Sequence, residues 1–145
     1  MRDIAYIALG SNLGDREQYL AAARDAIAQL PSTKVLGVTP VEETAPIGPP
    51  GQGPYLNQML AVETDLDAHA LLAALLEIET RAGRVRRERW SARTLDLDIV
   101  MFERQRVSDK QLVVPHPELG ARDFWLRELE ALRLVTGAAH GESRS

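Results

Sequence analysis

The spacing of hydrophobic residues along the chain predicts six elements in the order strand, helix, strand, strand, helix, strand. The segments with these patterns are 3–9, 15–30, 34–43, 55–65, 67–81 and 94–103. Apolar residues alternate or run continuously in the strand candidates and repeat at helical spacing in the other two. This order is that of the split βαβ arrangement. It predicts an α+β, ferredoxin-like βαββαβ core, in which helices pack on one face of an antiparallel sheet.

The rest of the chain adds little regular structure to this core. Residues 122–135 have the pattern of a last helix, and 136–145 have the composition of a frayed tail. Residues 44–54 hold four of the eight prolines and three of the ten glycines, so they predict a stiff loop. Such a loop is either a surface crossover or a binding loop.

Length and composition exclude several classes of protein. A chain of 145 residues has the size of one domain, so residues 1–145 are expected to fold as a single unit. The absence of cysteine excludes a disulfide scaffold, a thiolate zinc site and a cysteine nucleophile. The first nine residues lack the apolar run of a signal peptide. No stretch has the ~18 apolar residues that span a bilayer. We therefore expect a cytoplasmic protein that does not bind membranes.

Positive charge is concentrated in one short window. Residues 84–93 contain five arginines and one acid, so this window carries +4 and leaves −8 to the rest of a chain whose net charge is −4. Arginine offers a planar fork that suits phosphate and carboxylate oxygens. An acidic chain as a whole is not typical of a general nucleic-acid binder. The window therefore predicts a local site for a compact anion.

Two acids follow the arginine window directly. Asp96 and Asp98 alternate with Leu95, Leu97 and Ile99, so on a strand the two carboxylates share one face. Same-face neighbours lie roughly 6.5–7 Å apart, a spacing at which a cation relieves their repulsion. Carboxylate oxygens suit Mg²⁺, which takes one or two carboxylates together with phosphates and water. Arginines beside such a pair indicate a site for a nucleoside triphosphate and its metal. The alternatives are two solvated acids on an outer face, or salt bridges between the two groups.

Several ordered motifs resemble those of one family. The run from Arg89 to Asp98, RWSARTLDLD, resembles the signature of the 6-hydroxymethyl-7,8-dihydropterin pyrophosphokinases of folate biosynthesis. Further matches follow the family's order over about residues 4–126. They are the segments 8–14 (ALGSNLG), 43–48 (ETAPIG), 55–57 (YLN), 83–86 (GRVR), 114–117 (VPHP) and 122–124 (RDF).

The resemblance implies an enzyme that transfers pyrophosphate from ATP to the hydroxymethyl group of the pterin and leaves AMP. It assigns two Mg²⁺ ions to Asp96 and Asp98, and clamping of the phosphates to Arg84 and Arg93. It places Tyr55 and Phe124 on either side of the pterin ring. It assigns reading of the pterin's edge to Asn57, Thr44 and Ile47. The residues implied around ATP are Glu79, Arg86, Arg89, Trp90, Arg93, Ile99, His116 and Arg122. The implied protein is a monomer whose ligands are ATP and the pterin, without nucleic acid.

Two other classes of function remain alternatives at this point. The arginine window could belong to an RNA-binding module on a similar sheet, although the expected surface pair of aromatic residues is missing. The chain could also be a non-catalytic relative that binds pterin or nucleotide only, although both aspartates are present. Taken singly, Tyr55 and Phe124 could be core residues, and His116 could be an ordinary loop histidine.

Overall fold

The computed structural model describes residues 2–12, 14–45, 54–82 and 95–137 of the chain. In chain order, its elements are β1 (Asp3–Ser11), α1 (Arg16–Ala28), β2 (Thr33–Val38), β3 (Glu42–Thr44), β4 (Tyr55–Thr64), α2 (Ala68–Arg81), β5 (Asp96–Phe102), β6 (Val107–Ser108), β7 (Val113–Val114), a 3₁₀ turn (Leu119–Ala121) and α3 (Asp123–Thr136). The fold is a mixed α/β fold built on an antiparallel sheet, as the periodicity predicts.

The main sheet has the strand order β2-β4-β1-β5, and β3 pairs with the beginning of β4. All the pairings are antiparallel, and β1 runs beside β4 from the Asp3–Thr64 pair to the Ser11–Leu56 pair. Almost every residue of β1 is buried, because this strand lies in the middle of the sheet and is covered on both faces. Its continuous apolar run predicts this central position.

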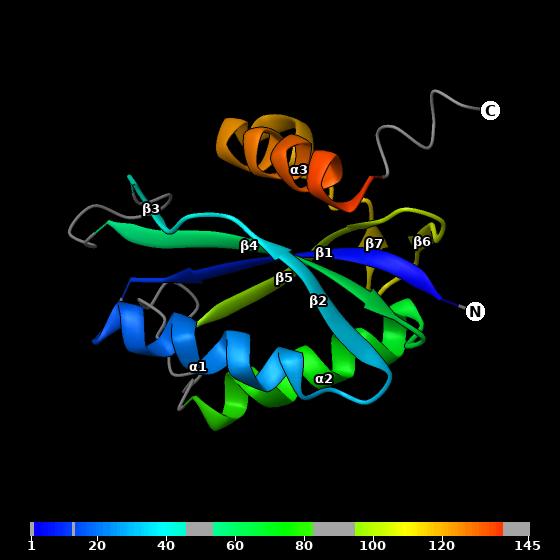
Figure 1. Cartoon of the computed structure of the whole chain (residues 1–145), viewed down its shortest axis with the longest axis horizontal. Coiled ribbons are helices and arrows are strands. Elements are labelled where there is room, and N and C mark those ends of the chain that lie inside the picture. Colours follow the sequence, from blue (N-terminus) through cyan, green and yellow to red (C-terminus); the bar gives the residue numbers. More distant parts are fainter. Residues whose placement is uncertain (1, 13, 46–53, 83–94, 138–145) are drawn as a thin grey trace.

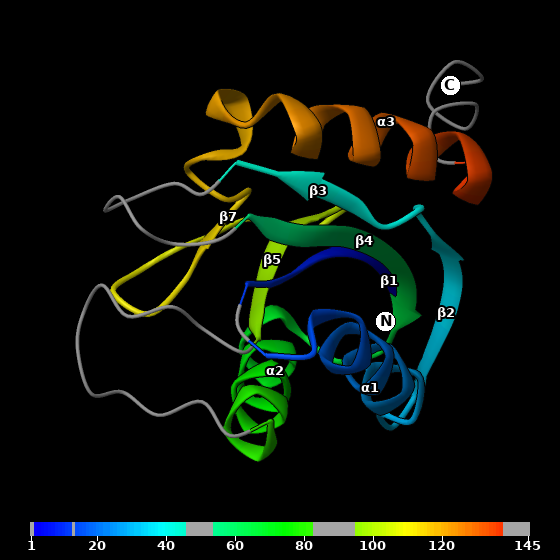
Figure 2. The same ribbon diagram turned by 90° about the vertical axis from the view of Figure 1, so that its left-hand side faces the viewer.

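Helices cover both faces of the sheet. Helices α1 and α2 lie against one face, and α3 lies across the other (Figure 1). The view in Figure 2, turned by 90°, shows the same three layers from the side. The two helices of the core motif occupy one face, as expected, and the position of α3 on the other face was not predicted. The sheet has an apolar core on each side, so a helix pattern alone does not say which core the helix joins.

The two core helices begin at the aspartates that the sequence suggests. The Asp15 carboxylate accepts a hydrogen bond from the Gln18 amide at 3.2 Å, and the Asp67 carboxylate accepts one from the Ala70 amide at 2.8 Å. Each bond satisfies an amide that has no partner inside the helix. The predicted helix segments 15–30 and 67–81 therefore begin at the observed capping residues.

The second strand candidate is interrupted in the structure. Residues 34–43 are divided into β2 and β3, with Pro40 in the gap. Proline has no amide to donate to a neighbouring strand, and the pairing with β4 already shifts its register between Val35 and Gly37. The Thr39 hydroxyl accepts from the Met59 amide at 2.9 Å, so a side chain replaces a strand contact at the break.

The C-terminal helix has the predicted length but lies one residue further along the chain than predicted, and its far end has a defined cap. It includes Thr136, which was predicted to begin the tail, and it ends at Gly137 with φ of 79°. This left-handed conformation favours glycine. Residues 138–145 lie outside the described residues.

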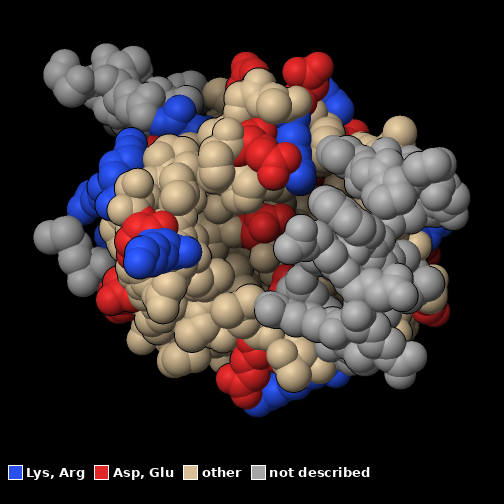
Figure 3. All heavy atoms as spheres, turned by 180° about the vertical axis from the view of Figure 1, so that it is seen from behind, with Lys and Arg blue, Asp and Glu red and all other residues tan. Residues whose placement is uncertain are grey.

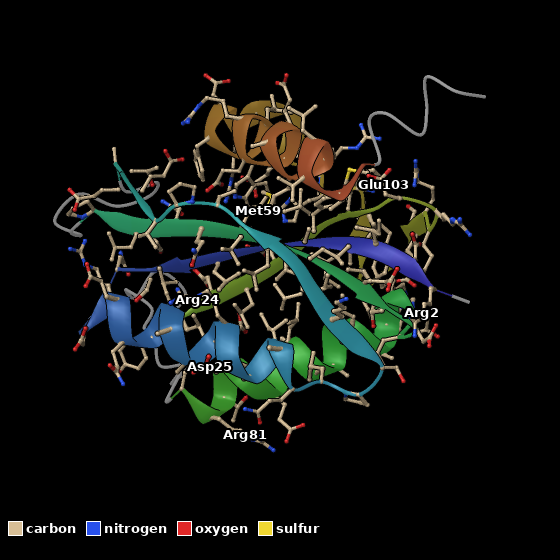
Figure 4. The ribbon with its side chains drawn as sticks, in the orientation of Figure 1. Arg2, Arg24, Asp25, Met59, Arg81 and Glu103 are labelled. Atoms are coloured by element: carbon tan, nitrogen blue, oxygen red, sulfur yellow. The ribbon has the colours of Figure 1, made fainter. Side chains whose placement is uncertain are left out.

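A polar cluster attaches the end of α3 to the sheet. Arg133 donates to both carboxylate oxygens of Glu103 at 2.8 and 3.1 Å, and the Tyr6 hydroxyl donates to the same carboxylate at 2.7 Å. Glu103 lies beneath the C-terminal end of the helix (Figure 4). Burial raises the pKa of Tyr6, so its hydroxyl stays protonated and available as a donor.

Among the described helices, none combines the length and the apolar character that crossing a membrane requires.

Candidate active site

The floor of a cavity of about 260 Å³ is formed by three adjacent strands. In the register of the sheet, Gly10 of β1 lies between Asn57 of β4 and Asp96 of β5, and Ala8 lies beside Asp98. All five residues line the cavity. Because Ala8 and Gly10 have little or no side chain, the sheet leaves a hollow between the amide on one side and the two carboxylates on the other. Acidic side chains are visible in a hollow on the face that Figure 3 presents.

One wall comes from β3 and β4. Thr44 ends β3 and pairs with Tyr55 at the beginning of β4. The Asn57 side-chain amide donates a hydrogen bond to the Thr44 hydroxyl, which links the two strands at the cavity. Thr44, Ala45 and Tyr55 line this wall. It therefore presents an aromatic ring beside polar groups that both donate and accept hydrogen bonds.

The opposite wall comes from the segment that leads into α3. His116, Glu118, Arg122, Phe124 and Trp125 line it. Arg122 donates to the Glu118 carboxylate at 3.0 Å. A second aromatic ring and a guanidinium group thus face the strands across the cavity.

The two aspartates project from the face predicted by strand alternation. Leu95, Leu97 and Ile99 are buried in the opposite core, whereas Asp96 and Asp98 are partly exposed at the cavity. In the described part of the chain, no group of three or more histidine, aspartate or glutamate side chains is arranged to hold a metal. A pair of carboxylates still fits Mg²⁺, because this ion completes its shell with phosphate oxygens and water.

His116 faces the acidic pair as a neutral imidazole. Its Nε2 lies 3.8 Å from Oδ1 of Asp98, and its Nδ1 accepts from the Glu118 amide at 3.0 Å. Burial lowers the pKa of His116, Arg122 acts in the same direction, and Glu118 opposes them. Since Nδ1 is an acceptor, the ring proton is on Nε2. The imidazole can therefore donate one hydrogen bond into the cavity near Asp98.

Glu79 supports the acidic strand from below the cavity. Its carboxylate is buried on α2 and accepts from the Leu97 amide at 2.7 Å. Leu97 lies between the two aspartates, so Glu79 fixes the backbone from which both carboxylates project.

A second cavity, of about 280 Å³, adjoins the first. Asp98 and His116 line both cavities, and Leu72, Ile99 and residues 109–113 contribute to the second. Two binding spaces therefore meet at one acid and one imidazole, an arrangement that suits two ligands reacting with each other.

Most of the site residues predicted from sequence within the described ranges lie together. The first cavity is lined by Thr44, Tyr55, Asn57, Asp96, Asp98, His116, Arg122 and Phe124. Ile99 is buried and lines the second cavity, and Glu79 is buried behind the acidic strand. Outside the described residues lie Ile47, Arg84, Arg86, Arg89, Trp90 and Arg93.

Sequence reasoning missed Glu118 and Trp125, although both line the cavity. Glu118 had one available signal, its position four residues before Arg122, a spacing at which a short helical turn brings opposite charges together. Trp125 had none, because two adjacent aromatic residues do not reveal which one faces the site.

Comparison with known proteins gives a consistent family. The family model described as 7,8-dihydro-6-hydroxymethylpterin-pyrophosphokinase (HPPK) matches residues 6–133. A 2-amino-4-hydroxy-6-hydroxymethyldihydropteridine pyrophosphokinase of Bacillus subtilis is 43% identical over 129 residues, which are 89% of this chain and 77% of that protein. A protein of the same name from Pseudomonas aeruginosa is 43% identical over 127 residues, 88% of this chain and 78% of its own.

The fold also resembles a solved structure. A crystal structure described as HPPK-DHPS in complex with substrates superimposes with a TM-score of 0.64 at 14% sequence identity. The match covers 88% of this chain and 39% of that one, so this chain corresponds to less than half of the larger protein. At this identity the likeness concerns the fold alone.

Proposed function

The chain belongs to the 7,8-dihydro-6-hydroxymethylpterin-pyrophosphokinase family, which transfers pyrophosphate to hydroxymethyldihydropterin in folate biosynthesis, and we propose that it uses MgATP for this reaction in the cavities described above. The observation that carries the proposal is the convergence of predicted pterin and metal residues from β3, β4, β5 and the beginning of α3 on one cavity.

The pterin is proposed to lie between Tyr55 and Phe124. These rings belong to opposite walls of the first cavity, and a flat heteroaromatic ligand stacks well on aromatic faces. Asn57 is at the floor between them, with an amide that can both donate and accept at the pterin's edge. Thr44 supports this amide by the hydrogen bond it accepts. Ile47 belongs to the same proposed site on the strength of the sequence motif.

Asp96 and Asp98 are proposed to hold two Mg²⁺ ions. When bound, the ions would neutralise the phosphate oxygens and the charge that develops between attacking and leaving oxygens. Glu79 fixes the strand that carries both carboxylates, through its hydrogen bond from the Leu97 amide. The position of this pair, beside the boundary of the two cavities, suits a metal complex shared by both substrates.

ATP is proposed to extend from this boundary into the second cavity. His116 donates from Nε2 and Arg122 presents its guanidinium, while Ile99 lines the wall. The sequence motifs add Arg84, Arg86, Arg89, Trp90 and Arg93 to the proposed nucleotide residues, and the family resemblance adds Glu79, which acts through the strand that its buried carboxylate fixes. Arginine side chains in this number would bind the polyphosphate without a glycine-rich loop.

The proposed reaction is an in-line displacement at the β-phosphorus of ATP. The hydroxymethyl oxygen of the pterin forms a new bond to the β-phosphorus. The bond between the β-phosphorus and the oxygen that bridges it to the α-phosphorus breaks, AMP leaves with that oxygen, and the hydroxyl proton is released. Such a transfer depends mainly on positioning and charge neutralisation. Arg84 and Arg93 are therefore proposed to act on the charge of the transition state.

Three structural proposals accompany this function. The strand order β2-β4-β1-β5 supports a ferredoxin-like description of the sheet. Residues 1–145 are proposed to form one domain that acts as a monomer. The composition supports a cytoplasmic location, with ATP and the pterin as ligands and no nucleic acid or membrane partner.

The deciding experiment incubates the chain with MgATP and 6-hydroxymethyl-7,8-dihydropterin and follows AMP by chromatography. Formation of AMP that requires both substrates is expected. A folded chain that binds both ligands by calorimetry and releases no AMP would refute the catalytic proposal in favour of a binding protein. Binding of RNA that weakens steeply with salt, without turnover, would favour the RNA-binding alternative.

A pair of variants tests the pterin site separately. Phe124→Ala is expected to weaken pterin binding more than ATP binding, because it removes one stacking face. The matched control is Leu126→Ala on the same helix, whose side chain is exposed and does not line the cavity. A larger loss for ATP than for pterin in Phe124→Ala would contradict the proposed sandwich.

A further inference from the structure

Trp125 belongs to the core and to the cavity at the same time. It is the third residue of α3, only 2% of its surface is exposed, and it is part of the apolar cluster between α3 and the sheet. The same side chain lines the first cavity. A residue in both places can transmit the rigid packing of the core to groups that face a ligand.

The indole contacts three side chains of the proposed binding site. The guanidinium carbon of Arg122 lies 4.3 Å from the centroid of the indole ring. The His116 ring meets the indole edge to face, with centroids 4.9 Å apart and planes at 87°. Phe124 lies at 6.3 Å and 69°. One buried ring therefore supports a cation, a hydrogen-bond donor and a stacking face.

His116 has little freedom once this contact is made. Its backbone amide donates to the Val100 carbonyl at 2.8 Å, which ties it to β5, and its Nδ1 accepts from the Glu118 amide at 3.0 Å. The indole packs against the ring itself. Rotation of the imidazole would break the Nδ1 hydrogen bond and the ring contact together, so the Nε2 donor keeps its direction towards Asp98.

Arg122 is held on two sides in the same way. The Glu118 carboxylate accepts from one terminal nitrogen at 3.0 Å, and the guanidinium carbon lies over the indole ring. The buried Nε of Arg122 has no hydrogen-bond partner among the described residues. A side chain with four rotatable bonds loses much entropy on binding an anion unless it is already ordered. The stack and the ion pair supply that order before a ligand arrives.

We propose that Trp125 is a positioning residue that orients His116 and Arg122 for the nucleotide, and that it determines affinity for MgATP more than affinity for the pterin. This proposal rests on the proposed function, because that assigns the nucleotide to these two residues. Among the contacts of Trp125 with Arg122, His116 and Phe124, the one with Phe124 is the longest. The stacking face proposed for the pterin therefore depends least on Trp125.

The test compares two replacements of Trp125. Trp125→Phe keeps an aromatic face, whereas Trp125→Met fills the space with a flexible chain that has no ring. In calorimetry with MgATP, Trp125→Met is expected to lose about tenfold in affinity and Trp125→Phe to stay within about threefold of the wild type. Pterin affinity is expected to change by less than about threefold in both. In turnover, the KM for ATP should rise more than kcat falls.

A spectroscopic measurement checks the geometry without using turnover. The chain has three histidines, so the carbon-bound imidazole protons of His116 can be assigned by NMR. The indole ring current should displace the His116 signals in the wild type, and Trp125→Met should abolish most of this displacement. The matched control is Leu132→Ala, which changes the same apolar cluster at a residue that does not line the cavity.

Three results would overturn the proposal. The first is a folded Trp125→Met variant with wild-type affinity for MgATP. The second is an equal loss of affinity for MgATP and for pterin in that variant. The third is a Leu132→Ala variant with the same loss of MgATP affinity and the same change in the His116 signals as Trp125→Met. Failure of the proposed function looks different. A wild-type chain that binds MgATP without forming AMP refutes the transfer reaction alone, since the affinities and the NMR signals do not depend on turnover.

Discussion

Glu128 is a buried acid that makes stability depend on pH. It lies on the face of α3 that packs on the sheet, with 5% of its surface exposed. One carboxyl oxygen accepts from the Thr39 hydroxyl at 3.2 Å, and the other has no hydrogen-bond partner among the described residues. Burial raises the pKa of Glu128 to about 7, Glu42 adds to the rise, and Thr39 and Arg127 oppose it. We therefore expect a neutral carboxyl in the folded protein at mildly acidic pH.

The raised pKa sets the sign and the size of the effect. Between the ordinary value of 4.5 and about 7, the folded state keeps a proton that the unfolded state releases. The free energy of unfolding therefore falls as pH rises through this window, and the stabilisation is fully present below pH 4.5. Each unit of pKa difference corresponds to about 1.4 kcal/mol, so the loss by pH 8 is about 3 kcal/mol at most.

Glu128→Gln tests this reasoning because it replaces the acid by a neutral group of the same shape. In urea denaturation, the variant is expected to match the wild type at pH 4 and to exceed its free energy of unfolding by up to about 3 kcal/mol at pH 8. Glu130→Gln, at an exposed position of the same helix, is the matched control and should leave the pH dependence unchanged. Parallel stability curves for Glu128→Gln and the wild type, or a variant less stable at pH 8, would refute the argument.

Three further predictions concern the acidic strand and the end of α3. Asp98→Asn should abolish AMP formation and leave the thermal midpoint nearly unchanged, because its side chain is 42% exposed; wild-type turnover would exclude the metal role. Glu79→Gln should lower the free energy of unfolding by about 1–3 kcal/mol in urea, because it weakens the bond that the Leu97 amide donates to a buried carboxylate; an unchanged midpoint would contradict this. Arg133→Met should cost about 2 kcal/mol, since it leaves the partly buried Glu103 carboxylate without its bidentate partner. If Arg133→Met and the wild type were equally stable at every pH from 3 to 7, the ion pair would contribute nothing.

The part of the site that lies on strands β1 and β5 could be predicted, because it follows from rules that operate over a few residues. Alternation on β5 is enough to put Asp96 and Asp98 on one face, and the buried Leu97 between them confirms it. The continuous apolar run of β1 is enough to put this strand in the centre of the sheet.

The wall formed by His116, Arg122 and Phe124 was expected from the family motifs alone, because its geometry depends on distant partners and not on local patterns. One residue of shift at the beginning of α3 turns a side chain by about 100°, so whether Phe124 or Trp125 faces the core depends on where the helix docks. Pro40 is a local signal for the break between β2 and β3, but the bonds that hold the break come from a distant strand: the Thr39 hydroxyl accepts from the Met59 amide, and the Thr39 carbonyl accepts from the Gln58 side chain at 2.6 Å. Neither the docking nor these bonds leave a pattern in the local sequence.

This division has a consequence for how variants of the site behave. Asp98 projects from a strand whose other face forms the core, so its removal leaves the packing intact and separates chemistry from stability. Trp125 contributes to the core and to the cavity wall, so its removal changes both stability and ligand affinity. For a residue on β5 such as Asp98, loss of activity in a variant therefore identifies a catalytic role directly. For a residue on α3, loss of activity can come from unfolding or from misplacement of Arg122 and His116. The variants Trp125→Phe and Trp125→Met therefore have to be compared at the same fraction of folded protein.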